Sequence, residues 1–200
     1  MGFDAKKPQV IPGVLKLYVR IPLERIKVLT SNNRQVIKEL EDRTLTKISI
    51  DEVNSYAIVE PSTPNTPVIN VIKAKEFINA VAVGFPPEKA WRLLNDDQVL
   101  LIIDLKVAVG DAQNHLMRIK GRVIGEGGRV RKNIEEITGT YISVYDDYVA
   151  IIGDYESANL AREAVEMLIQ GRQHTTVYKY LDRVAHEVKK KRITTIWSKD

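Results

Sequence analysis

The stretch RIKGRVIGEGGRVRK, residues 118–132, sets three glycines between two groups of basic side chains. Apolar residues recur at helical spacing on either side of Gly125, Gly127 and Gly128, so the pattern predicts two short helices joined by a tight loop. Glycine lets a chain turn sharply, and it lets another group approach the backbone without meeting a Cβ atom. The stretch therefore indicates either a loop that binds phosphate or a simple turn between two helices.

The sequence around this loop alternates between strand-like and helix-like patterns. A β-branched run precedes the first helix, a pair of such runs typical of a hairpin follows the second helix, and a longer helix closes the series. The predicted elements are a strand at 98–110, helices at 111–125 and 129–138, a hairpin at 141–154 and a helix at 156–170.

The first half of the chain repeats this order, strand, helix, loop, helix, strand, strand, helix, at a constant offset of 94 positions. Its loop is the polar break TSNNR at 30–34, and its last helix is predicted at 68–84. The repeat predicts two domains, residues 1–96, which end in a connector helix, and residues 97–200. The matching pairs are Leu40 and Ile134, Glu41 and Glu135, Thr44 and Thr138, Thr46 and Thr140, Ile48 and Ile142, and Ser49 and Ser143.

Composition limits the classes of protein to which the chain can belong. Its 200 residues are 44% hydrophobic, which is enough for a core, and a formal charge of +4 leans weakly towards anionic partners. The absence of cysteine excludes disulfides, thiol catalysis and thiolate zinc sites. The first residues show no apolar signal core and no run is long enough to span a membrane, so we expect a cytoplasmic protein without a membrane partner.

Positive charge is concentrated next to the glycine loop. Within residues 118–132, six basic side chains stand against one acidic side chain, that of Glu126. A solvated helix face usually mixes the two signs, so this excess favours contact with phosphate groups. The six basic residues are Arg118, Lys120, Arg122, Arg129, Arg131 and Lys132.

Spacing excludes the other chemistries that use glycine loops. The chain contains no Gly-Lys-Ser/Thr sequence and therefore no P-loop. A dinucleotide-binding fingerprint would need glycine or alanine at Val130, and a strand instead of a helix before the loop. The three histidines are scattered and form no metal-binding pattern. We therefore expect no catalytic residue, no metal and no cofactor.

The sequence VIGEGG followed by RVRKNIEEITGTYISVYDDYVAIIG, at 123–153, resembles a KH domain. Over nearly its full length the chain resembles the archaeal partner-of-Nob-one family, also called dimethylase-interacting, whose members are small-ribosomal-subunit assembly factors. The more specific matches are GFPPEKAWRLLN at 84–95, RIKGRVIG at 118–125 and HTTVYKYLDR at 174–183. The resemblance implies an α+β fold of two tandem type I KH modules (βααββα) with a connector helix and a C-terminal helix.

In a KH module the GxxG loop clamps the backbone of a single nucleic-acid strand. The resemblance therefore assigns the clamp to Gly125, Gly127 and Gly128 and the surrounding phosphate field to the six basic residues. Glu126 is expected to weaken the attraction for phosphate. The remaining expected RNA contacts are Ile124, Ser143, Tyr145, Tyr178 and Lys179.

Two interpretations of the C-terminal segment remain open. Tyrosine and lysine side chains there suit base stacking and phosphate contact. The i, i+3, i+4, i+7 spacing of its apolar residues instead predicts a helix docked on the second domain, with Tyr180 in the docked face. The spaced residues are Val177, Tyr180, Leu181 and Val184.

The first copy of the loop reads Ser31-Asn32-Asn33-Arg34, so both glycines of the GxxG motif are missing. Without them we expect a degenerate KH module that serves packing and protein contact, although Arg34 retains a charge that suits phosphate.

The expected function is the binding of single-stranded RNA, with no chemistry performed by the chain itself. By resemblance the target is the 3′ end region of small-subunit rRNA, and the protein partners are the Nob-one endonuclease and a translation initiation factor subunit. The alternative is a protein-interaction scaffold that uses KH folds for docking and has little specific RNA affinity.

Overall fold

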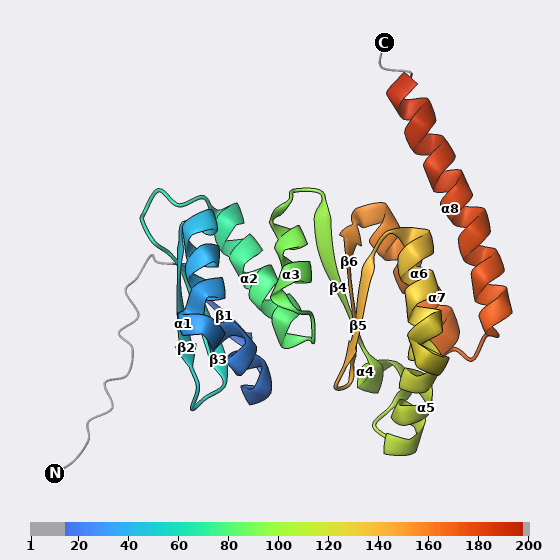
Figure 1. Ribbon diagram of the computed structural model, residues 1–200, viewed down its shortest axis with the longest axis horizontal. Helices are drawn as coiled ribbons and strands as arrows, with labels where there is room; N and C mark the ends of the chain where they lie inside the picture. The colour runs from blue at the N-terminus through green and yellow to red at the C-terminus, as the bar shows by residue number, and fades with distance from the viewer. Residues whose placement is uncertain (1–14, 198–200) are drawn as a thin grey trace. The chain divides into compact units, whose positions relative to one another are not determined.

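The computed structural model describes residues 15–197 and divides the chain into two compact units, Met1–Ala82 and Val83–Asp200. Each unit combines a small antiparallel sheet with packed helices, which makes the fold α+β (Figure 1). Within the described residues, no helix is both long and apolar enough to cross a membrane. The expectation about a signal sequence concerns residues 1–14, which lie outside the described part.

Unit 1 contains an antiparallel sheet with the strand order β1-β3-β2. Its first helix begins after Pro22, whose fixed φ and missing N–H suit a helix start, and whose carbonyl accepts the N–H groups of Arg25 and Ile26. The elements are β1 (Leu17–Arg20), α1 (Leu23–Thr44), β2 (Thr46–Asp51), β3 (Tyr56–Pro61) and α2 (Val68–Ala82).

The long helix α1 is two helices joined by a break at 31–34. Asn32, Asn33 and Arg34 adopt left-handed φ angles of 50°, 54° and 61°. The polar break predicted from the sequence is therefore a loop, and unit 1 has the element order that the repeat predicts.

Unit 2 contains a second antiparallel sheet, with the strand order β4-β6-β5. Its strand order matches that of unit 1, element for element. The elements are α3 (Pro87–Ala90), η1 (Trp91–Leu94), β4 (Gln98–Asp104), α4 (Leu105–Val109), α5 (Gln113–Ile124), η2 (Glu126–Gly128), α6 (Arg129–Thr138), β5 (Tyr141–Tyr145), β6 (Tyr148–Asp154), α7 (Tyr155–Ile169) and α8 (His174–Trp197).

The two units also share three side-chain interactions at the same offset. In each, a buried threonine donates to the carbonyl four residues earlier and meets the hydroxyl of a second threonine, while a glutamate accepts the N–H of an isoleucine. The three distances are 2.6, 2.7 and 2.6 Å in unit 1 and 2.7, 2.8 and 2.7 Å in unit 2. The residues are Leu40, Glu41, Thr44, Thr46 and Ile48, and then Ile134, Glu135, Thr138, Thr140 and Ile142.

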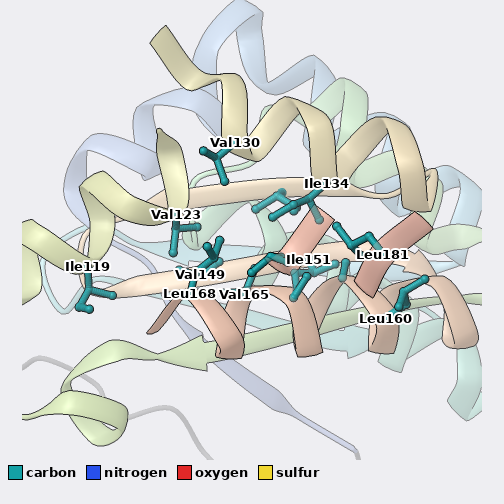
Figure 2. Packing of buried hydrophobic residues seen from close by; sticks show 14 of the residues in the cluster. Ile119, Val123, Val130, Ile134, Val149, Ile151, Leu160, Val165, Leu168 and Leu181 are labelled. Atoms are coloured by element: carbon teal, nitrogen blue, oxygen red, sulfur yellow. The ribbon is translucent and has the colours of Figure 1, made fainter. Parts of the chain in front are cut away.

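The core of unit 2 anchors the glycine loop on both sides (Figure 2). Val123 in the last turn of α5 and Val130 in the first turn of α6 are both buried in it. Helix α8 contributes Val177 and Leu181, which are fully buried in the same core. The C-terminal segment is therefore a helix docked on unit 2, as its apolar spacing predicts.

Two boundaries differ from those predicted. The strand predicted at 98–110 ends at Asp104, whose carboxylate accepts the N–H of Val107 at 3.1 Å and so begins α4. The apolar run continues across this point, which is why the pattern alone does not show the change. Residues 83–96, placed by the repeat at the end of the first domain, group in the structure with unit 2.

Candidate nucleic-acid interface

The glycines of the loop have two different structural roles. Gly125 has φ 72° and ψ 171°, and an added Cβ atom would lie 2.2 Å from Val130 Cγ2. Gly127 and Gly128 have φ angles of 59° and 79°, and a Cβ atom on either would meet open space. Gly125 is thus required for packing, whereas the next two glycines leave an uncovered backbone at the start of α6.

Part of the loop's hydrogen-bonding capacity is used internally. The N–H of Gly125 donates to Gly121 O at 2.8 Å, and the N–H of Gly128 donates to Gly125 O at 3.1 Å. The N–H of Arg129 donates to Glu126 O. The N–H groups of Glu126 and Gly127 are therefore the loop's candidates for an anionic ligand, beside the positive end of the α6 dipole.

Three of the six basic residues near the loop are held by other parts of unit 2. Lys120 Nζ lies 3.0 Å from Asp147 Oδ1. The Arg122 guanidinium donates to Leu168 O at 3.2 Å and to Arg172 O at 2.6 Å, so it caps the end of α7. Arg131 Nε lies 3.9 Å from Glu135 Oε2.

Asp147 joins the hairpin turn to two helices. Its other oxygen lies 2.6 Å from Lys106 Nζ, and its backbone carbonyl accepts the N–H of Leu105 at 2.8 Å. Hydrogen bonds from Lys106 and Lys120 hold the pKa of the Asp147 carboxyl below its usual value. The charge of Lys120 is consequently neutralised within the protein and adds little to a phosphate field.

The other three basic residues are available to a ligand. Arg118, Arg129 and Lys132 are exposed, and none of them forms a hydrogen bond or ion pair with the described part of the chain. Glu126 is exposed within the loop itself. The cationic surface is therefore smaller than the sequence suggests, and it lies at the end of α5, at the start of α6 and on the next turn of α6.

The apolar residues near the loop serve mainly the core. Ile134 and Ile142 are fully buried, and Val144 packs against the same cluster. Ile124, in the last turn of α5, is half-buried and stands next to Gly125. Ile124 is therefore the apolar side chain of this group that retains surface beside the loop.

The outer face of β5 is covered by the segment that links the two units. The Ser143 hydroxyl is buried and donates to Val83 O at 3.0 Å. Tyr145 lies against Gly84, where an added Cβ atom would approach Tyr145 Cβ to 2.4 Å. Both side chains were predicted to contact RNA, but Ser143 is occupied by a protein contact and Tyr145 is half-buried beside one.

Helix α8 divides the predicted C-terminal contacts. Tyr178 is half-buried against the core, whereas Lys179 is exposed. The Tyr180 hydroxyl donates to Glu163 in α7, and burial together with this bond raises the pKa of Tyr180 to about 12. Tyr180 thus belongs to the docked face of the helix.

The corresponding loop of unit 1 is filled by its own side chain. Arg34 Nη2 donates to Ile48 O on strand β2 at 3.4 Å. Gly128, at the equivalent position in unit 2, has no side chain to make such a contact.

Sequence reasoning missed the residues that act across long separations. Lys106 and Asp147 form ion pairs, and Lys89 and Arg92 lie over the ring of Tyr141 on β5. Gly84 gave one usable signal, since a glycine followed by two prolines suggested a break before the connector. Among the described residues no group of histidine, aspartate and glutamate side chains could hold a metal ion.

The family model of the second KH domain of PNO1, described as a eukaryotic-type (type I) KH domain, matches residues 99–186. A KH domain-containing protein of Methanocaldococcus jannaschii is 37% identical over 181 residues, which cover 90% of this chain and 78% of that protein.

Two solved structures are also similar to this chain. A protein of unknown function from Aeropyrum pernix has a TM-score of 0.91 at 49% identity, over 94% of this chain and 99% of that one. The a/eIF2alpha-aDim2p-rRNA complex of Pyrococcus horikoshii has a TM-score of 0.81 at 40% identity, over 88% of this chain and 96% of the matched chain.

Proposed function

The chain belongs to the KH-domain family of PNO1 and archaeal Dim2p, and from this premise we propose that it binds single-stranded RNA through the loop at 125–128. The observation that carries the proposal is the uncovered left-handed backbone of Gly127 and Gly128 at the start of α6. Such a backbone accepts a phosphate without a steric barrier, and the helix dipole favours negative charge there.

We propose that the contacts form two groups around this loop. The N–H groups of Glu126 and Gly127 bind phosphate, while exposed cations attract the strand. Ile124 and Lys179 are further proposed contacts, and Tyr145 and Tyr178 are secondary ones because both are half-buried. The exposed cations are Arg118, Arg129 and Lys132.

The proposed target is the 3′ end region of small-subunit rRNA, with the chain acting as an assembly factor. The similar complex from Pyrococcus horikoshii contains rRNA and a/eIF2alpha, which supports both an rRNA target and an initiation factor subunit as a partner. The Nob-one endonuclease is a further proposed partner. We propose that the chain acts in the cytoplasm and performs no chemistry of its own.

We propose that both units are KH modules and that the first is degenerate. Its element order and strand order equal those of unit 2, and the three threonine and glutamate interactions recur in it. Because Arg34 occupies its loop, unit 1 serves packing and protein contact in this proposal.

A double substitution tests the loop. Gly127→Asp with Gly128→Asp places two negative charges at the proposed phosphate site, and we expect a loss of affinity of about 10- to 100-fold for rRNA 3′-end oligonucleotides. The fold should survive, because Asn33 and Arg34 hold the same torsions in unit 1 without glycine. Gly125 is left intact, since any side chain there would collide with Val130.

The matched control is Asn33→Asp with Arg34→Asp in the first loop. It adds the same side chains at the equivalent positions, and RNA affinity should be unchanged. A titration in which the Gly127 and Gly128 variant, folded by thermal melting, binds as tightly as the parent would reject the loop as the site. Weak binding by the parent chain that moderate salt removes would favour the protein-interaction scaffold.

A further inference from the structure

A cleft of about 380 Å³ lies in unit 2 between the connector, formed by α3 and η1, and the C-terminal end of α6. Three basic side chains line it, Lys89 and Arg92 from the connector and Lys132 from α6. The ring of Tyr141, the first residue of β5, forms part of the same wall. The proposed function assigns no role to Lys89 or Arg92.

The two connector cations are held in place. Arg92 Nη1 donates to Gly139 O at 2.9 Å, and Arg92 Cζ lies 5.4 Å from the centre of the Tyr141 ring. Lys89 Nζ lies 4.7 Å from the centre of that ring. A ligand that meets these side chains therefore loses less conformational entropy than one that must order them.

The connector is also fixed to the strand beside the loop. Ser143 binds Val83 O, and Gly84 lies against Tyr145 so closely that no other residue fits there. Because β5 and α6 share one core, the connector cations keep a constant position relative to the glycine loop.

The charge of the cleft favours an anion, with one exception. The Glu135 carboxylate is already engaged, since it accepts the N–H of Ile142 at 2.7 Å and lies 3.8 Å from Lys89 Nζ. Lys132 has no partner in the described part of the chain. Glu136 is exposed at the edge of the cleft and opposes an anionic ligand.

The cleft continues the surface that begins at the loop. Helix α6 has 10 residues, so the cleft at its far end is ~15 Å from the loop. Arg129 and Lys132 are three positions apart and therefore share one side of this helix. A GxxG loop clamps about four nucleotides, and a longer strand must leave the clamp and cross the neighbouring surface.

We propose that the cleft binds phosphate groups of the same RNA strand beyond the four clamped nucleotides, with Lys89 and Arg92 as the contacting residues. The proposal rests on the proposed function, because it takes the strand from the loop. An acidic protein segment would meet the same cations, but the line from Arg129 through Lys132 to the connector favours a ligand that already occupies the loop.

Probe length separates this site from the loop. The full chain is titrated with a four-nucleotide rRNA 3′-end probe and with eight-nucleotide probes extended at the 5′ or the 3′ side. Lys89→Gln with Arg92→Gln should leave the affinity for the short probe unchanged. For one of the long probes it should lower the affinity several-fold and reduce the log–log salt slope by up to about 1.4, or about 0.7 per phosphate contact.

Three controls complete the test. Arg92→Lys in place of Arg92→Gln keeps the charge and should restore part of the affinity. Glu136→Gln should have the opposite sign and strengthen the binding of the same long probe. Lys38→Gln, at the position of unit 1 equivalent to Lys132, removes an exposed cation remote from the proposed path and should change nothing.

The outcomes are distinct. If the double variant binds both long probes like the parent, the cleft does not bind RNA, and binding of a polyglutamate peptide that the double variant loses would then assign it to an acidic protein. An equal loss for short and long probes would also overturn the proposal, because the substitutions would be acting on the loop. Failure of the proposed function appears separately, as unchanged binding after Gly127→Asp with Gly128→Asp.

Discussion

The loops at 31–34 and 125–128 hold nearly the same backbone with different residues. Asn33 and Gly127 have φ, ψ of 54°, 36° and 59°, 19°, and Arg34 and Gly128 have 61°, 29° and 79°, 11°. The turn itself therefore does not need glycine at these two positions. What glycine provides in unit 2 is open space, and the space is what the side chain of Arg34 occupies in unit 1.

The loops diverge at their first residue, and a single methyl group should expose the difference. Gly125→Ala would place Cβ 2.2 Å from Val130 Cγ2 at a φ of 72°, which should lower the free energy of unfolding by about 2–4 kcal/mol. Ser31 has φ −58°, so Ser31→Ala should cost less than about 0.5 kcal/mol. Chemical denaturation of both variants measures this, and equal losses would refute the distinction.

The shared threonine pairs should respond alike in the two units. Thr44→Val and Thr138→Val each remove a buried hydroxyl with two partners at comparable distances. We expect a loss of about 1–2 kcal/mol in each case, localised by hydrogen exchange to the unit that carries the change. A large effect in one unit and none in the other would break the structural equivalence.

The exposed lysines at equivalent positions should differ in RNA binding. Lys132→Gln should lower the log–log salt slope by up to about 0.7 and the affinity by a few-fold, since it removes one proposed phosphate contact. Lys38→Gln changes the same position in unit 1 and should leave both quantities unaltered. Titrations at several salt concentrations check the pair, and equal slopes for the two variants would remove Lys132 from the proposed surface.

The smallest expected effect is on acid stability and concerns a residue that unit 1 lacks. Two lysines depress the pKa of Asp147, whose counterpart at the same offset is the exposed Val53. The resulting stabilisation is present above the unfolded pKa of about 3.9 and is lost as pH falls through the lower folded value. Asp147→Asn should flatten this decline below about pH 4 in melts across pH. A decline as steep as in the parent chain would show that the ion pairs do not contribute.

Local pattern was sufficient to predict most of the element order. Helical spacing around 118–138 and the paired β-branched runs predicted α5, α6 and the β5–β6 hairpin, and the constant offset extended them to unit 1. The spacing of Val177, Leu181 and their neighbours predicted the docked face of α8. These features depend on residues a few positions apart, which a sequence displays directly.

The candidate site was less predictable because charge pattern does not show where a side chain ends. Six basic residues promised a uniform phosphate field, yet Arg122 caps α7 through two carbonyls far along the chain. Lys120 is paired with Asp147 across 27 positions. The burial of Ser143 depends on the connector, whose docking on β5 no short-range pattern reveals.

The left-handed torsions at Asn32, Asn33 and Arg34 have a consequence for finding such loops in other chains. A scan for glycine spacing would pass over the first loop, although its backbone follows the second through its last two residues. Three consecutive left-handed residues between two helices form a geometric signature that survives the replacement of every glycine. Searching structures for this torsion string would recover vestigial copies that residue-based motifs overlook, and would date the loss of glycine after the fixing of the turn.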